Sequence, residues 1–300
     1  MLGDARYRRA AVERPEMREL RRLSDAAGIA RLAGHLVALV AAGALVALAP
    51  SWPFRVPAQA LEGAVLVFLF APLHETVHRT AFRNRRLNAV VSAVIGFLLV
   101  LPASYFRYFH FAHHRYTQDP VRDPELATAK PTTLRQWFWV LTGVPVWREH
   151  VLGVLRHAVG RVSEPYLTLI QARRVVVEAR VHLALYTAIA VASVALGSDA
   201  ALRYWLIPAL LGQPWLRVFL MAEHTDCPLV PDMLRNSRTT LTHGFVRYFA
   251  WNMPFHSEHH SDPAVPFHAL PRLHLRLAPL LGQTAQGYLA AQREIVRGLC

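Results

Sequence analysis

Residues 61–78 read LEGAVLVFLFAPLHETVH, an apolar stretch that ends in two histidines, His74 and His78. Apolar runs of this kind are typical of membrane-spanning helices, and residues four apart lie on one face of a helix. The sequence therefore predicts two imidazoles that face one point at the end of a span. At this histidine frequency such a pair is expected about once by chance, so the other histidines must decide whether it binds a metal.

The rest of the chain contains further apolar stretches that could cross a membrane. A helix needs roughly 20 residues to cross the hydrocarbon, so the first three of the four stretches would have to extend into their flanks. Short connectors at residues 50–57 and 198–201 would join the stretches into two helical hairpins. The four predicted spans cover residues 34–49, 58–73, 182–197 and 202–222.

Arginines are distributed unevenly about these predicted spans. Only Arg55 lies in the two connectors, whereas many arginines lie before the first span and after the second. By the positive-inside rule the connectors face outward and the remaining segments face the cytoplasm. The arginines that carry this inference are Arg6, Arg8, Arg9, Arg14, Arg18, Arg21, Arg22 and Arg31 before the first span, and Arg79, Arg83, Arg85 and Arg86 after the second.

A fifth apolar stretch, residues 89–106, is ambiguous. If it crossed the membrane, His78 and His110 would lie on opposite sides and could not share a site, so we expect it to lie along the interface or to re-enter. Residues 134–157 mix aromatic and basic side chains, which is typical of an interfacial helix. The predicted fold is an all-α membrane protein with four transmembrane helices in two hairpins, interfacial helices and a cytoplasmic cap that bears a di-metal site.

The composition supports a membrane protein built as one domain. Hydrophobic residues make up 53% of the 300 residues, charged residues 18%, and the mean hydropathy is +0.22. A net charge of +13 on so apolar a chain favours a membrane surface over a nucleic acid as partner. Two cysteines, Cys227 and Cys300, exclude iron–sulfur clusters and cysteine-based zinc sites. We expect a basic cytoplasmic segment at residues 1–32 and a single membrane-embedded catalytic domain at residues 33–300.

Two further histidine clusters have the pattern H-x-x-H-H, at residues 110–114 and 256–260. Chance would give such a triple only about 0.04 times in a chain of this histidine content. Glu223 and His224 directly follow the fourth predicted span, which places His224 at about the depth of the first cluster. Nine histidines are too many for one metal and suit two, and imidazole binds Zn, Cu, Fe or Ni. The predicted ligands are His74, His78, His110, His113, His114, His224, His256, His259 and His260, with His243 left open as an alternative to His224.

Carboxylates near these histidines could accept hydrogen bonds from the imidazoles and orient them. Glu75 and Glu258 lie inside the first and third clusters, and we expect them to act at the catalytic site in this orienting role rather than as bases. The sequence does not pair individual carboxylates with individual histidines. The candidates are Glu75, Asp119, Asp123, Glu125, Glu223, Glu258 and Asp262.

The order of the three histidine clusters resembles that of the membrane fatty acid desaturase superfamily, in particular its bacterial branch. The local sequences HHRYTQDP at 113–120, WNMP at 251–254 and PAVPFH at 263–268 are similar to that branch as well. The first cluster has three residues between its histidines, unlike the four of acyl-CoA desaturases, and the third begins with His256 rather than the glutamine of front-end desaturases. The resemblance extends over residues 61–275.

The resemblance implies a non-haem di-iron oxidoreductase in which the histidines of the three clusters bind two iron ions. It also implies the use of O2 to desaturate or hydroxylate a fatty acyl chain or another lipid, and His224 resembles the extra ligand of membrane alkane hydroxylases. The chain lacks the His-Pro-Gly-Gly motif of a fused cytochrome b5, so electrons would come from a separate ferredoxin or rubredoxin. The expected location is the bacterial inner membrane, with the site on the cytoplasmic face and no nucleic-acid partner.

Two other functional classes fit part of the pattern. Residues 74–78 are also a literal H-E-x-x-H, in which His74 and His78 would bind zinc and Glu75 would be the general base of an intramembrane metalloprotease. That interpretation gives the two H-x-x-H-H triples no role. A histidine-rich metal transporter or sensor would need ligands distributed along a path through the spans, whereas the sequence gathers them at one membrane surface.

Overall fold

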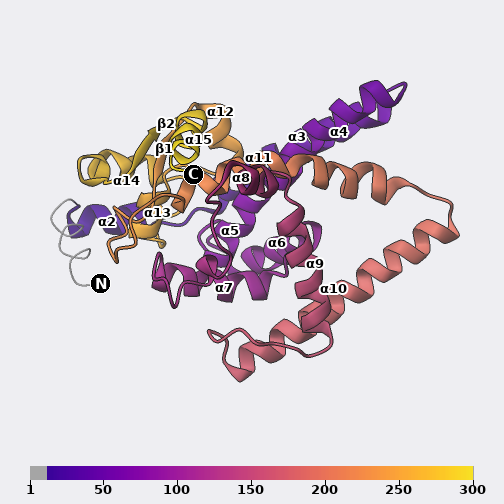
Figure 1. Ribbon diagram of the computed structural model, residues 1–300, viewed down its shortest axis with the longest axis horizontal. Helices are drawn as coiled ribbons and strands as arrows, with labels where there is room; N and C mark the ends of the chain where they lie inside the picture. Colours follow the sequence, from indigo (N-terminus) through magenta and orange to yellow (C-terminus); the bar gives the residue numbers. More distant parts are fainter. Residues whose placement is uncertain (1–11, 300) are drawn as a thin grey trace.

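The computed structural model describes residues 12–299, and the described chain is mostly helical (Figure 1). Four helical segments in this range are long and apolar enough to cross a membrane. Each is longer than the corresponding apolar stretch, because the helices extend into flanking residues as the required span length demands. The segments are α3 (Asp25–Leu48), α4 and α5 together (Trp52–His78), α10 (Leu169–Ala195), and η2 and α11 together (Leu202–His224).

The first connector is shorter than predicted. Helix α4 (Trp52–Val67) already begins at its third residue, so Pro53 and Pro57 lie inside the helix and not in a loop at 50–57. Pro53 is tolerated because it lies in the first helical turn, where the N–H groups have no helical acceptor, whereas Pro57 lies in the helix interior. Only residues 49–51 therefore separate α3 from α4, and the two helices pack against each other.

The second and fourth candidate spans touch backbone to backbone. A Cβ atom at Gly63 would lie 1.9 Å from Pro208 O, and one at Gly212 would lie 2.1 Å from Gly63 O. Both positions therefore require glycine, which lets membrane helices approach closely. Because α5 (Phe70–His78) follows α4, and His224 ends α11 (Ile207–His224), this contact sets the spacing between two histidine-bearing helix ends.

The ambiguous fifth stretch forms two helices, α6 (Arg85–Leu98) and α7 (Ala103–Tyr116), which are bent by 100° relative to each other. Both pack against α5 (Figure 1). The bend returns α7 toward the end of α5, where the ring centroids of His78 and His110 lie 4.8 Å apart. His78 and His110 therefore lie side by side, which would be impossible if residues 89–106 crossed the membrane between them.

Side chains of α10 hold the turn between α6 and α7. Tyr186 Oη donates to Phe97 O near the end of α6 (2.8 Å), and Glu178 Oε2 accepts from Ser104 N at the start of α7 (2.8 Å). Polar backbone groups at membrane depth must be paired inside the protein, because lipid offers them no partner. These contacts therefore allow a non-helical turn at this place.

Residues 134–157, predicted as one interfacial helix, form two. Helix α8 (Leu134–Leu141) ends before Gly143, whose positive φ of 70° breaks the helical path, and α9 (Val144–Ala158) follows. Phe138 and Trp139 are more than half exposed, as expected for side chains that contact lipid headgroups. One continuous helix was therefore the wrong prediction, because Gly143 readily adopts the left-handed conformation that interrupts it.

The remaining elements form a cap around the third histidine cluster. Its core is built by Trp251, Phe267 and the apolar face of α14, and its N-terminal helix α2 is attached through the ion pair Arg21–Asp262 (2.5 Å). The all-α prediction was wrong in one detail, because β1 and β2 form a two-stranded parallel sheet that pairs Thr240 with Ala285. The cap comprises α2 (Arg14–Leu20), η1 (Pro124–Ala127), β1 (Thr239–Leu241), α12 (Gly244–Phe249), α13 (His256–Ser261), α14 (Leu270–Leu277), η3 (Ala278–Leu280), β2 (Thr284–Gln286) and α15 (Tyr288–Arg297).

The basic N-terminal segment is only partly described. Arg6, Arg8 and Arg9 lie outside the described residues, as does Cys300, whereas Cys227 is a buried free thiol. Within the described part, Arg21 is committed to its ion pair with the cap. Arg21 therefore holds the N-terminal segment against the cap, whatever it contributes to the orientation of the protein in the membrane.

The predicted re-entry of residues 89–106 can be tested by labelling the segments on either side of them. In a Cys227→Ser, Cys300→Ser background, single cysteines placed within residues 79–88 and within residues 115–130 should react with a membrane-impermeant maleimide from the same side. A cysteine in the connector at 198–201 serves as the control and should react from the other side. Labelling of the first two segments from opposite sides would show that residues 89–106 cross the membrane.

Candidate metal centre

All nine predicted ligands lie next to one another and divide into two groups. Ligand nitrogens of five imidazoles lie within 4.8 Å of one another, and those of three others do the same. A ninth imidazole, His256, joins the smaller group because its Nε2 lies 2.9 Å from His224 Nε2. The five-histidine group is His74, His78, His110, His114 and His259, and the four-histidine group is His113, His224, His256 and His260.

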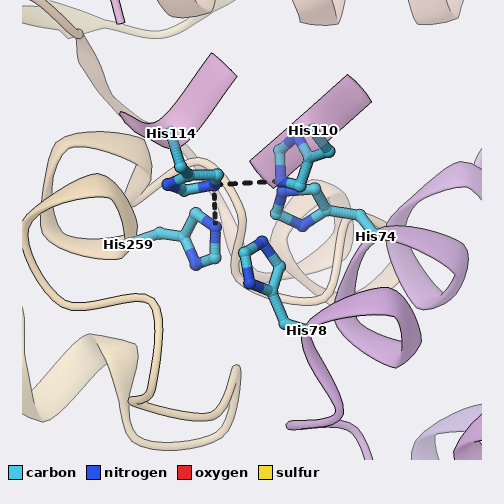
Figure 2. Close-up of side chains that lie close together, drawn as sticks. All are labelled: His74, His78, His110, His114 and His259. Atoms are coloured by element: carbon cyan, nitrogen blue, oxygen red, sulfur yellow. Dashed lines mark hydrogen bonds between the residues drawn. The ribbon is translucent and has the colours of Figure 1, made fainter. Parts of the chain in front are cut away.

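Helices α5, α7 and α13 build the five-histidine group (Figure 2). His114 Nε2 lies 2.9 Å from His110 Nε2 and 3.2 Å from His259 Nε2, and these are the contacts dashed in Figure 2. Both ring nitrogens of His74 and Nε2 of His78 are buried without a hydrogen-bond partner. Buried polar atoms without partners are costly, so convergent lone pairs of this kind fit a metal ion.

Helical geometry explains how each H-x-x-H-H triple contributes to both groups. Successive residues of a helix point about 100° apart. Residues i and i+4 therefore point in nearly the same direction, whereas residue i+3 points about 100° away from i+4. His110 and His114 belong to the five-histidine group, whereas His113 belongs to the other. The third cluster does the reverse, since His256 and His260 join the four-histidine group and His259 joins the five.

Each imidazole of the four-histidine group has a polar neighbour at Nδ1, which leaves Nε2 facing the group. His113 Nδ1 contacts Asp123 Oδ1 (2.9 Å), and His224 Nδ1 contacts Asn236 O (3.1 Å). Such partners fix the ring orientation and make the opposite nitrogen a better metal ligand. The other two neighbours are Thr117 Oγ1, 3.3 Å from His260 Nδ1, and Glu223 Oε1, 3.2 Å from His256 Nδ1.

The three histidines of α13 are neutral at physiological pH. Burial, followed by the neighbouring imidazoles, holds the pKa values of His256, His259 and His260 well below the usual range for histidine. A neutral imidazole has the free lone pair that a metal requires, whereas a protonated one does not. Metal binding at these side chains therefore needs no proton release at neutral pH.

The two carboxylates inside the clusters contact partners that the sequence did not indicate. Glu75 Oε2 accepts from Thr80 Oγ1 (2.6 Å), and Glu258 accepts from Thr239 Oγ1 and contacts His274 Nδ1 (both 2.5 Å). None of these hydrogen bonds reaches a histidine of the two groups. Both carboxylates therefore brace the segments that carry the clusters.

The contacts that Asp123 and Asn236 make with histidines of the site could not be predicted from the sequence. Asp123 was one of seven carboxylate candidates and was not singled out as Glu75 and Glu258 were, and the contact of Asn236 uses a backbone carbonyl, for which a sequence carries no signal. His243 flanks α12 and lies outside both groups, so the geometry favours His224 as the ninth ligand. His268 likewise lies outside both groups.

The chain is similar to one protein family and to individual members of it. The pattern described as fatty acid desaturase matches residues 50–291. The sn-1 oleoyl-lipid 12-desaturase of Picosynechococcus sp. is 26% identical over 269 residues, which cover 83% of this chain and 76% of that enzyme. The sphingolipid delta(4)-desaturase/C4-monooxygenase of Rattus norvegicus is 27% identical over 232 residues, 74% of this chain and 65% of that protein. The chain thus covers less than two thirds of the sphingolipid relative.

Proposed function

Since the chain belongs to the fatty acid desaturase family, we propose that it uses O2 and external electrons to desaturate or hydroxylate unactivated C–H bonds of a fatty acyl chain or another lipid. The family and the relatives imply an oxidoreductase that acts on lipids. Its apolar helices indicate a multi-pass membrane protein. The observation that carries the proposal is the convergence of nine histidines in two adjacent groups that could each hold a metal ion.

The proposed cofactor is a pair of non-haem iron ions, one in each histidine group. The donor set fits, because iron accepts imidazole ligands and the groups offer five and four of them. Two irons would supply the oxidising chemistry that removal of hydrogen from an unactivated C–H bond requires. The protein's own contribution is to keep the α13 histidines neutral, to orient the imidazoles of the four-histidine group through their Nδ1 neighbours and to keep bulk water away from the buried side chains.

The proposed substrate is a lipid that approaches the five-histidine group from the apolar part of the protein. Phe70 stacks on His74 with ring centroids 6.3 Å apart, and Phe106 stacks on His110 at 5.3 Å. These aromatic rings form an apolar wall beside the imidazoles. The glycine contact between α4 and α11 leaves no room for an acyl chain between these two helices at the level of Gly63, so the chain would lie on the α6 and α7 side of the second span.

The proposed electron donor is a separate ferredoxin or rubredoxin that docks near the five-histidine group. Phe111 is 36% exposed and its ring lies 5.3 Å from that of His78, while the guanidinium of Arg107 lies 4.2 Å above the Phe111 ring. A basic and aromatic surface of this kind suits an acidic protein partner. Docking there would bring the donor close to the proposed metals.

The proposed arrangement in the cell follows from the arginine distribution. Residues 1–32 would be a cytoplasmic segment, and residues 33–300 would form a single membrane-embedded catalytic domain with two helical hairpins. The cap and both histidine groups would face the cytoplasm across the bacterial inner membrane. Arg79 and Arg107 near His78 support this assignment, because positively charged side chains collect on the cytoplasmic side.

The contacts of Glu75 disfavour the zinc metalloprotease. A general base must reach a metal-bound water, yet Glu75 is fully buried and accepts from Thr80 Oγ1 (2.6 Å). His74 and His78 are joined by three further imidazoles, whereas a protease would need only one more ligand. The compact grouping equally disfavours a transporter, whose ligands would follow a path.

Lipid analysis tests the proposed reaction. Expression with a ferredoxin system should give host lipids in which mass spectrometry finds a loss of two hydrogens or a gain of one oxygen. His113→Ala, expressed at the same level, should abolish the product because it removes a ligand of the four-histidine group. A purified protein with one zinc and no iron, or full O2-dependent activity of His113→Ala, would contradict the proposal.

A further inference from the structure

The two histidine groups are unequal, and a carboxylate lies beside the smaller one. Five imidazoles form one group and four form the other. Glu125 Oε2 lies 3.5 Å from His113 Nε2, the nitrogen that also lies 3.2 Å from His224 Nε2. The opposite nitrogen of His113 is engaged by Asp123. Glu125 therefore approaches the ring of His113 on the side that faces the group.

The separation between Glu125 and His113 is one that two ligands of a single metal could adopt. Ligand atoms about 2.1 Å from a metal lie roughly 3 Å apart when adjacent and about 4.2 Å apart when opposite. The observed 3.5 Å falls between these values. Glu223, a third carboxylate near this group, contacts His256 at Nδ1 and so lies on the outer side of that ring.

Local structure holds Glu125 in this position. Glu125 belongs to the short helix η1, and Asp123 caps that helix by accepting from Glu125 N (2.9 Å) while the same oxygen contacts His113 Nδ1 (2.9 Å). One carboxylate oxygen thus fixes both the imidazole and the backbone that carries Glu125. The arrangement couples the position of the carboxylate to the orientation of the ring.

Lys130 orients the carboxylate from the other side. Its Nζ lies 3.9 Å from Glu125 Oε1 and donates to His224 O (2.9 Å). This residue is the only lysine in the chain. Because Oε1 faces Lys130, Oε2 is left to face His113. The lysine thereby ties the carboxylate to the end of α11, which carries another histidine of the same group.

We propose that Glu125 is a metal ligand at the four-histidine group, so that each metal has five ligands from the protein. This inference rests on the proposed two-metal function. The anionic oxygen makes the two sites chemically different, since one metal is held by neutral imidazoles alone and the other also by a carboxylate. Glu125 is the most exposed ligand of its site, with 37% of its side chain accessible. It is therefore the ligand that exchanges most readily with water.

Binding of cobalt(II) to the full-length protein in detergent tests the assignment. The metal-free protein would be titrated with Co²⁺ without oxygen, and bound metal and the visible d–d bands would be recorded. Wild type should bind two ions per chain. Glu125→Gln and Glu125→Ala should bind one ion as wild type does and the second at least about 10-fold more weakly, with changed d–d bands. Glu125→Asp should restore part of the second binding step.

A matched control removes a carboxylate from a histidine outside the metal centre. Glu164 contacts the buried His157 Nε2 (2.8 Å), so Glu164→Gln should leave both Co²⁺ binding steps unchanged. The first binding step reports whether each variant is folded. Wild-type affinity and unchanged d–d bands at both sites of Glu125→Gln would overturn the role of Glu125 and leave the two-metal proposal standing. Failure of wild type to bind a second ion would overturn both.

Discussion

Replacement of His259 by alanine is expected to lower lipid product formation by more than about 100-fold and to leave one metal ion per chain. His259 is fully buried, and its Nε2 lies 3.2 Å from His114 Nε2 in the five-histidine group. Loss of a residue that only hydrogen-bonds to a metal ligand already lowers metal affinity or activity by about 10–100-fold. Loss of a ligand itself should therefore cost more. Metal analysis of the purified protein and mass spectrometry of the lipids measure the two effects.

The matched control for His259→Ala is His243→Ala. His243 flanks α12 and belongs to neither group, so its removal should leave two metals and wild-type product. Size-exclusion chromatography in detergent would show that both variants are folded. Retention of two tightly bound metals by His259→Ala would remove this residue from the proposed ligand set.

Replacement of Asp123 by asparagine is expected to weaken metal binding at the four-histidine group by about 10–100-fold, with a similar loss of product. Asp123 accepts three contacts, from His113 Nδ1 (2.9 Å), Gln118 N (2.8 Å) and Glu125 N (2.9 Å). Asparagine keeps one acceptor oxygen and loses the negative charge, so it cannot serve all three. The five-histidine group should keep its affinity because none of its members contacts Asp123 in the described structure.

Asp119→Asn is the control for Asp123→Asn. Asp119 lies in the same loop, but its carboxylate is paired with the exposed Arg122 (2.5 Å) and not with a histidine. Surface ion pairs contribute little to stability, so this variant should bind both metals normally. Stepwise metal titration separates the two sites. An Asp123→Asn protein that binds both metals with wild-type affinity would show that the charge of Asp123 does not act on His113.

Short sequence motifs predict which histidines form the candidate site, but not how these histidines divide between the two groups. The sequence predicted the nine histidines, because H-x-x-x-H and H-x-x-H-H patterns place imidazoles on shared helix faces. It could not assign His113 and His114, adjacent in the chain, to different groups. That division depends on the helices that face each side of α7, and their packing is not encoded within the five residues of the motif.

The apolar segments, the nine candidate metal ligands and the family could all be predicted from the sequence alone. These features follow from residue type and spacing along one helix, which need no knowledge of neighbours. By contrast, the packing of the elements shows that Asp123, and not Glu75 or Glu258, contacts a histidine of the two groups. It also decided that Glu125 lies beside His113. Contacts between residues on different elements arise when the helices pack, and the bend of α6 against α7 and the glycine contact of α4 with α11 fix that packing.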